Sequence, residues 1–360
     1  MGDLLKNQID KNFVERLISL LSSETKIFPA QVFRKSVFSH NWNNLELKQR
    51  ITHIVKLMHE SLPGTYETKL KVLTKVAPHF SGLGALIFPE FVSSYGQGHW
   101  DESIRALEHF TRYCTSEFAI RTFLKLDLKR GMQQMEEWSK HDNEHVRRLA
   151  SEGCRPRLPW SFKLVDLVKD PADIYPILNQ LKDDESLYVR KSVANNLNDI
   201  SKDHPDLVLS WAKDWIGKSE RTDWILKHAL RTLLKRGDQR ALKLFGVGKV
   251  KNIKVTKLNL AQKSFKIGKH LSFDLTYELK GQKPQKVRIE YAIHYHKKNG
   301  SKSKKVFKIS EKEIVSGTYS LSKKHSLRQM TTRKHYPGPH QIEIILNGEI
   351  MLMKTFELIK

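Results

Sequence analysis

Apolar residues follow two different periods along the chain. From about residue 10 to residue 245 they recur at spacings of three and four, the period of an α-helix, most clearly in segment 102–110, where Ile104, Leu107 and Phe110 share a face. After Gly246-Val247-Gly248 the pattern changes to alternating runs bounded by turn residues, which predicts short β-strands. We therefore predict two domains, a helical one over residues 1–245 and an all-β one over residues 249–360.

Four apolar–basic pairs recur in the helical part, at Ile120-Arg121, Val146-Arg147, Val189-Arg190 and Leu226-Lys227. They are 26, 43 and 37 residues apart, with other amphipathic helices between them. These lengths are near that of a HEAT-type helix pair, so we predict an α-solenoid of HEAT-like repeats. Any single one of these cations is best interpreted as an ordinary solvated helix residue. Their repetition in four units, however, favours a basic stripe on the concave face. The stripe comprises Arg121, Arg147, Arg148, Arg190, Lys191, Lys227 and Arg231.

The second part contains about seven alternating runs. They span residues 254–260, 271–279, 287–295, 306–309, 319–321, 342–346 and 350–356. Asn299-Gly300 and Asn347-Gly348 are strong hairpin signals. This number of strands fits a small immunoglobulin-like sandwich without its disulfide. A barrel remains an alternative.

Positive charge is concentrated in the predicted sandwich. The chain has a formal charge of +24, and residues 249–360 contain 25 Lys and Arg against 8 Asp and Glu, a net +17. Such an excess most often binds nucleic acid and less often an anionic membrane, and a merely solubilising charge is the bland alternative. No basic amphipathic helix with an apolar face stands out, which favours nucleic acid. We expect contacts from loops that contain Lys304 and Lys305, and Arg333 and Lys334.

Other function classes find little support. The start of the chain lacks a signal-peptide pattern, and no run of 18 apolar residues occurs, so we expect a cytoplasmic protein that does not bind membranes. The two cysteines, Cys114 and Cys154, are too few for a disulfide framework. His141 and His145 have helical spacing but no evident third ligand. We therefore expect no metal or other cofactor, and a monomer without an obligate protein partner.

Two glutamates stand in strongly cationic surroundings. Glu117 lies in the segment Ser116-Glu117-Phe118-Ala119-Ile120-Arg121, and Glu152 is flanked by arginines on both sides. These arginines are Arg147, Arg148, Arg155 and Arg157, and we expect all four to contact DNA. A proline-bounded loop then presents Trp160, either against the substrate or as a filler between two repeats.

These segments resemble a known family, the HEAT-like DNA alkylation-repair glycosylases of the AlkC type. The resemblance runs through the Glu117 segment, through Arg147 to Trp160, and through residues 189–205. It covers the middle third of the chain closely and the N-terminal helices loosely, and the sandwich agrees with the immunoglobulin-like tail of some members. Thr122 stands where we expect a proline, which should alter local packing only.

The resemblance implies excision of cationic N-methylated bases, 3-methyladenine and 3-methylcytosine, from double-stranded DNA in base excision repair. A cationic base leaves readily, so the enzyme must chiefly stabilise an oxocarbenium-like sugar, which a carboxylate can do. We expect Glu117 and Glu152 to act in this way or to hold the attacking water, with Asp199 as a third acid and Trp160 beside the sugar or lesion. The competing interpretation is a non-enzymatic HEAT scaffold that binds nucleic acid or protein.

Overall fold

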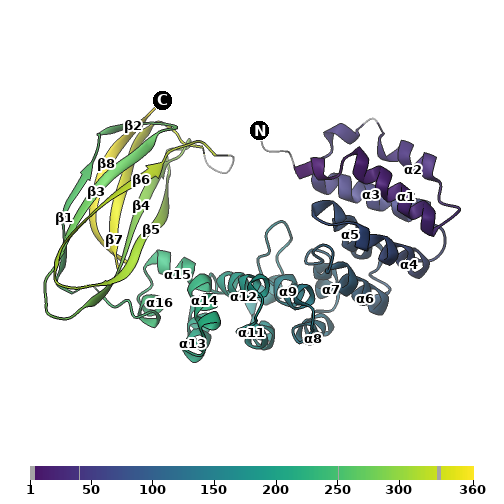
Figure 1. Ribbon diagram of the computed structural model, residues 1–360, viewed down its shortest axis with the longest axis horizontal. Helices are drawn as coiled ribbons and strands as arrows, with labels where there is room; N and C mark the ends of the chain where they lie inside the picture. The colour runs from purple at the N-terminus through teal and green to yellow at the C-terminus, as the bar shows by residue number, and fades with distance from the viewer. Residues whose placement is uncertain (1–4, 40, 250, 331–333) are drawn as a thin grey trace. The chain divides into compact units, whose positions relative to one another are not determined.

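The computed structural model describes the chain except for residues 1–4, 40, 250 and 331–333, and Arg333 therefore lies outside the described residues. The described chain forms two compact units: residues 1–203 with 217–229, and residues 204–216 with 230–360. The first unit is helical, and the second combines three helices with two β-sheets (Figure 1). Within the described residues, no helix is both long and apolar enough to cross a bilayer.

The first unit contains helices α1 to α12 and α14. They are α1 (Lys11–Glu24), α2 (Ala30–Val37), α3 (Leu47–Ser61), α4 (Tyr66–Val76), α5 (Ile87–Tyr95), α6 (Trp100–Phe110), α7 (Ile120–Leu126), α8 (Leu128–Trp138), α9 (Glu144–Gly153), α10 (Val165–Lys169), α11 (Tyr175–Leu181), α12 (Leu187–Ile200) and α14 (Glu220–Ala229). Short 3₁₀ turns lie at Leu5–Gln8, Trp42–Asn44, Ala77–His79, Leu83–Leu86 and Ala172–Ile174. The HEAT-like helical architecture is as predicted.

The four apolar–basic pairs lie on α7, α9, α12 and α14. Their apolar members, Ile120, Val146, Val189 and Leu226, are all buried, as the helical period predicts. α12 packs against both α9 and α14, so these helices share one core.

Polar side chains fix where several of these helices begin. Asp127 accepts a hydrogen bond from the backbone N–H of Arg130 at 3.0 Å, and Asn143 accepts one from His145 at 2.9 Å. The Ser186 hydroxyl accepts one from Tyr188 at 3.2 Å. Such caps satisfy the free N–H groups of the first turn. These caps set the starts of α8, α9 and α12. Helices α9 and α12 carry part of the site described below.

The second unit contains helices α13 (Pro205–Trp215), α15 (Arg231–Arg236) and α16 (Gln239–Leu244). Its strands are β1 (Ile253–Leu260), β2 (Ser264–Lys266), β3 (His270–Leu279), β4 (Gln285–His296), β5 (Lys302–Ile314), β6 (Gly317–Ser326), β7 (Gly338–Leu346) and β8 (Glu349–Ile359). They form one sheet in the order β1-β3-β6 and another in the order β2-β8-β7-β4-β5. The pairs are antiparallel except for β2 with β8.

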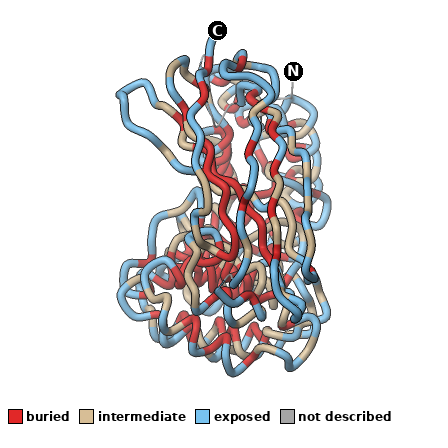
Figure 2. The backbone as a smooth tube through the Cα atoms, turned by 90° about the vertical axis from the view of Figure 1, so that its left-hand side faces the viewer, coloured by how far each residue is buried: buried red, intermediate tan, exposed pale blue. Residues whose placement is uncertain are grey.

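The sandwich core follows from strand alternation. On β3, Leu271, Phe273, Leu275, Tyr277 and Leu279 are buried, and the residues between them are not. They join side chains of β4, β7 and β8 in one apolar cluster between the sheets. Figure 2 shows these buried positions as red stretches along the strands. The predicted sandwich is thus confirmed.

Two predicted details of the sheets are wrong. The sequence missed the three-residue strand β2, and it placed Lys304 and Lys305 in a loop although they lie in β5. The turn around Asn299-Gly300 is so tight that β5 begins at Lys302, directly opposite His296. β1, β2, β5 and β6 are the sheet edges. Each edge strand carries lysine: β1 has Lys254 and Lys257, β2 has Lys266, β5 has five lysines from Lys302 to Lys312, and β6 has Lys323 and Lys324.

The β7–β8 hairpin packs on the loop between α15 and α16. Asn347 and Gly348 have positive φ of 46° and 82°, the conformation that the Asn-Gly turn predicts. A Cβ on Gly237 would lie 2.7 Å from the Gly348 carbonyl oxygen, so the two glycines permit the close approach. The Gln239 amide also donates to the Asn347 carbonyl at 3.1 Å. These contacts join α15 and α16 to the sandwich within the second unit, and the predicted boundary at residues 245–249 stays a prediction.

Candidate active site

Three acidic side chains of the first unit are buried in adjacent segments. Glu117 precedes α7, Glu152 lies in the last turn of α9, and Asp199 lies near the end of α12. Their exposed fractions are only 8%, 5% and 2%. Isolated carboxylates are rarely buried to this extent, because desolvation penalises the charge. Their partners therefore define the site.

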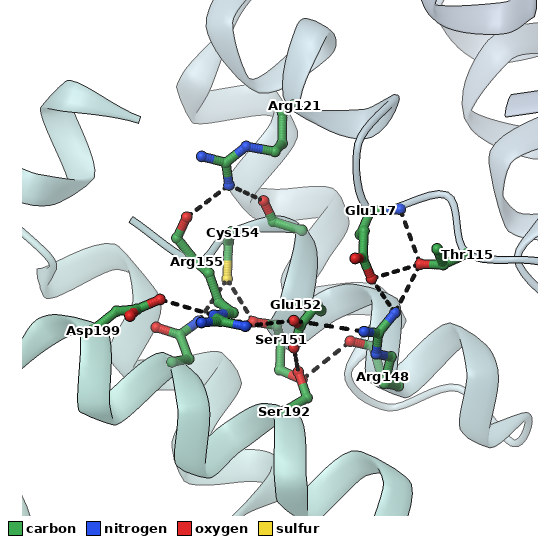
Figure 3. Close-up of polar contacts among 12 residues, drawn as sticks. Thr115, Glu117, Arg121, Arg148, Ser151, Glu152, Cys154, Arg155, Ser192 and Asp199 are labelled. Carbon is green, nitrogen blue, oxygen red and sulfur yellow. Dashed lines mark hydrogen bonds and ion pairs between the residues drawn. The ribbon is translucent and has the colours of Figure 1, made fainter. Parts of the chain in front are cut away.

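Two arginines link the three acids into an alternating chain of charges (Figure 3). Arg148 pairs with Glu117 and, at 3.5 Å, with Glu152 Oε1. Arg155 donates to Glu152 Oε1 at 2.6 Å and to Asp199 Oδ2 at 2.8 Å. Burial by itself lowers the pKa of each guanidinium, but the neighbouring carboxylates outweigh it, and both pKa values lie above the ordinary one. Arg148 and Arg155 thus remain charged.

Hydroxyl groups complete the bonding of the two glutamates. Thr115 Oγ1 donates to Glu117 Oε2 at 2.7 Å and accepts from Arg148 Nη1 at 2.7 Å. Ser192 Oγ donates to Glu152 Oε2 at 2.7 Å. Lys202 pairs with Asp199 Oδ1 at 2.7 Å. Among the described residues no group donates to Glu117 Oε1, so this oxygen can accept a hydrogen bond from a bound molecule.

Arg121 does not line a DNA-binding surface, and its predicted role is wrong. The side chain is fully buried. Its Nη1 donates to the carbonyls of Gly153 at 2.9 Å and Arg155 at 2.6 Å, and its Nη2 donates to Phe162 at 2.5 Å. Burial lowers its pKa to about 10. Arg121 anchors the loop that joins α9 to α10, and its Nε, which has no partner among the described residues, is buried and so out of reach of a phosphate.

Trp160 projects from this same loop. Its side chain is 57% exposed, and it is one of the few described non-glycine residues with positive φ, at 65°. It lines a pocket of about 140 Å³ together with Thr115 and Phe118, the neighbours of Glu117. The structure therefore brings Trp160 to the Glu117 segment. Its exposure does not fit a role as filler between two repeats.

Most of the other predicted DNA-binding cations have protein partners. Arg155 Nε and Nη1 bind the acids of the charge chain, and its predicted DNA contact stays a prediction. Arg147 pairs with Asp184 at 2.7 Å, and Arg157 binds Asp203 at 2.8 and 2.7 Å. Arg190 donates to the carbonyls of residues 184 and 185, each at 2.8 Å. Lys191 is exposed, and Lys227 and Arg231 are half-buried.

In the sandwich, Lys304 pairs with buried Glu343 at 2.5 Å. Lys305 and Lys334 are exposed. Their predicted DNA contacts, like those of Lys191, Lys227 and Arg231, stay predictions.

The sequence interpretation missed the hydroxyl groups of the site. Thr115 and Ser192 hold the two glutamates, but serine and threonine are frequent, and nothing in their spacing distinguishes these two. Both histidines have protein contacts: His141 Nδ1 accepts from the Asn143 backbone N–H, and the His145 ring packs against Tyr188.

Comparisons with known proteins agree with this architecture. The family model "DNA alkylation repair enzyme" matches residues 99–233, and "Uncharacterised protein YhaZ, C-terminal Ig-like domain" matches residues 254–360. The YhaZ protein of Bacillus subtilis (strain 168) is 47% identical over 359 residues, 99% of this chain and 100% of the relative. The solved Pseudomonas fluorescens alkylpurine DNA glycosylase AlkC, bound to DNA containing an abasic site analog, has a TM-score of 0.96 and 40% identity, over 99% of this chain and 100% of that one.

Proposed function

Since the chain belongs to the family of YhaZ and AlkC, we propose that it is a DNA glycosylase that excises cationic N-alkylated bases. The substrates are 3-methyladenine and 3-methylcytosine in double-stranded DNA, and the reaction opens base excision repair. The similarity to AlkC along 99% of the chain supports this activity and does not favour a non-enzymatic scaffold.

The observation that carries the mechanism is the buried chain of three carboxylates and two arginines. Together with Lys202, which pairs with Asp199, the two arginines balance the three carboxylates, in surroundings where electrostatic interactions are strong. As the N-glycosidic bond breaks, its electron pair neutralises the departing base, and positive charge develops on the sugar. Prearranged carboxylates stabilise that charge without reorganisation. Glu152 and Asp199 provide this stabilisation in our proposal.

Glu117 is the residue we assign to the water. Its Oε1 accepts no hydrogen bond from a described group, while Oε2 is held by Thr115 and Arg148. A water bound at Oε1 transfers a proton to the carboxylate as its oxygen bonds to C1′ of the deoxyribose. Trp160 would lie against the sugar or lesion, where the negative face of the indole favours a cation.

The positive charge of the surface would hold the DNA backbone. Lys191, Lys227 and Arg231 in the helices, and Lys304, Lys305 and Lys334 in the sandwich, are the proposed contacts. Arg147, Arg148, Arg157 and Arg190 would contribute to the electrostatic field, although each also binds a protein group. Affinity should then fall as salt concentration rises.

Residues 1–245 would form the glycosylase domain and residues 249–360 the basic sandwich that adds DNA affinity. We propose that the protein acts on DNA without a cofactor. We also propose that it works as a monomer in the cytoplasm.

Base release tests the proposal directly. Purified protein, without added metal, is incubated with a duplex that contains one 3-methyladenine or 3-methylcytosine, and free base and abasic sites are measured. Glu117→Gln and Glu152→Gln should bind the duplex but release base at least about 100-fold more slowly. Glu137→Gln, at an exposed position of α8, is the matched control. Binding without release by the wild-type protein would contradict the enzymatic function.

A further inference from the structure

The backbone of Trp160 is held in a conformation that its side chain disfavours. Among described non-glycine residues, positive φ occurs at Trp160, Asn252 and Asn347. Asparagine tolerates the left-handed region because its short side chain bonds locally, whereas a bulky residue there is an outlier. Such outliers persist only when surrounding contacts hold them, and they cluster at functional sites. The contacts of Trp160 therefore matter for its position.

Packing alone does not hold this residue. The indole is more than half exposed, and the cavity of about 140 Å³ lies beside it. Lys48, Glu90, Thr115 and Phe118 also line this cavity. A residue that borders open space is held less by packing, so a polar contact to its backbone contributes more to its position.

Lys48 supplies such a contact from a distant part of the chain. It lies in the first turn of α3, 112 residues before Trp160, and its Nζ donates to the Trp160 carbonyl. The same Nζ is 5.5 Å from the centre of the Phe118 ring. Phe118 directly follows Glu117. One exposed ammonium group thus touches both segments that present the site.

A half-buried carboxylate, that of Glu90, lines the same cavity. Burial raises the pKa of Glu90, and the positive charge of Lys48 opposes that rise. The ammonium group is kept beside the cavity by two partners of different kinds, a carbonyl and an aromatic ring.

We propose that Lys48 is a positioning residue, which fixes the Trp160 backbone and so holds the indole against the sugar or lesion. The inference rests on the proposed glycosylase function. It assigns to the N-terminal helices a part in catalysis, although all the acids of the site come from residues 117–199.

The test is a double-mutant cycle in single-turnover base excision, with enzyme in excess over the 3-methyladenine duplex. Lys48→Met keeps the aliphatic stem and removes the donor. It should slow excision about tenfold, since small misplacements in an active site have effects of this order or larger. Lys48→Arg, which restores a donor, should recover most of the rate. Lys56→Met, at an exposed position of the same helix, is the matched control and should have the wild-type rate.

If Lys48 acts through Trp160, the effect of Lys48→Met must depend on the presence of the Trp160 side chain. In a Trp160→Ala background, Lys48→Met should change the rate less than twofold, because the group that Lys48 positions is gone. DNA affinity and thermal unfolding midpoint should stay near wild type, since Lys48 is exposed. Equal slowing in both backgrounds, or no slowing in either, would overturn the inference while wild-type base release leaves the proposed function intact. No release by the wild-type protein would overturn both.

Discussion

Arg121 offers the sharpest test of how the site is supported, because sequence and structure give it opposite roles. Arg121→Met keeps most of the side-chain length but removes the three donors to the Gly153, Arg155 and Phe162 carbonyls. Hydrogen bonds from a charged donor contribute about 1.5–3 kcal/mol each, and the contributions are not additive. Each buried carbonyl that is left without a donor costs about 1–3 kcal/mol. We expect a loss of about 4 kcal/mol in the free energy of unfolding of the first unit.

Calorimetry and DNA binding separate the two roles. For a unit of this size, 1 kcal/mol corresponds to about 2–4 °C, so the unfolding midpoint should fall by about 12 °C. Below that midpoint, the slope of log K against log salt for a DNA duplex should stay as in the wild type. Lys191→Met, at an exposed position of α12, should do the reverse: unchanged midpoint, and a slope smaller by about 0.9, the value for one lost phosphate contact. An Arg121→Met protein of wild-type stability with a reduced slope would refute the reasoning.

Three further outcomes follow from the structure. Ser192→Ala removes the donor to Glu152 Oε2, so it should lower the free energy of unfolding by about 1.5–3 kcal/mol and slow base excision. Denaturant unfolding measures the loss of stability, and a variant as stable as the wild type would contradict the expectation. Trp160→Gly should be about 1 kcal/mol more stable than Trp160→Ala, because only glycine adopts positive φ without cost, yet both should excise poorly; equal unfolding midpoints would contradict the strain. Burial, opposed by the bond to Ser103, raises the pKa of Tyr66 to about 12, so the folded state holds this proton more tightly than the unfolded state. The resulting stability is fully present below pH 10 and is lost as the pH rises towards 12. Tyr66→Phe should show less of this loss when unfolding is measured against pH.

Most of the fold could be predicted from the helical period and the strand alternation of the sequence. Val146 and Val189 are core residues because apolar side chains at three- and four-residue spacing must face the neighbouring helices. The same logic failed for β5, which lies at a sheet edge and whose residues do not alternate between buried and exposed. Its first four residues, Lys302 to Lys305, are exposed or half-buried and have the composition of a loop, which is why the sequence predicts a loop at Lys304 and Lys305.

The site was predictable only in part. Glu117, Glu152 and Asp199 were found through the resemblance of their segments to a family, together with the arginines around Glu152. Arg121 looked equivalent to Arg147 and Arg190, because each follows a buried apolar residue on a helix. What distinguishes Arg121 is a set of carbonyls 32 to 41 residues further along the chain. Contacts at this separation leave no trace in local periodicity, and the same applies to Lys48 with Trp160.

The lysines on the four sheet edges have a consequence for how copies of the protein behave in concentrated solution. An edge strand exposes N–H and C=O groups to which a strand of another molecule can add, and this is a common route to aggregation. β5 is long and pairs with only one neighbour, so it is the most exposed to this hazard, and Lys302, Lys304, Lys305, Lys308 and Lys312 lie along it. A second copy that approached edge to edge would bring these charges together. The lysines to which we assign the attraction of the sandwich for a polyanion therefore also oppose edge-to-edge pairing of one sandwich with the next.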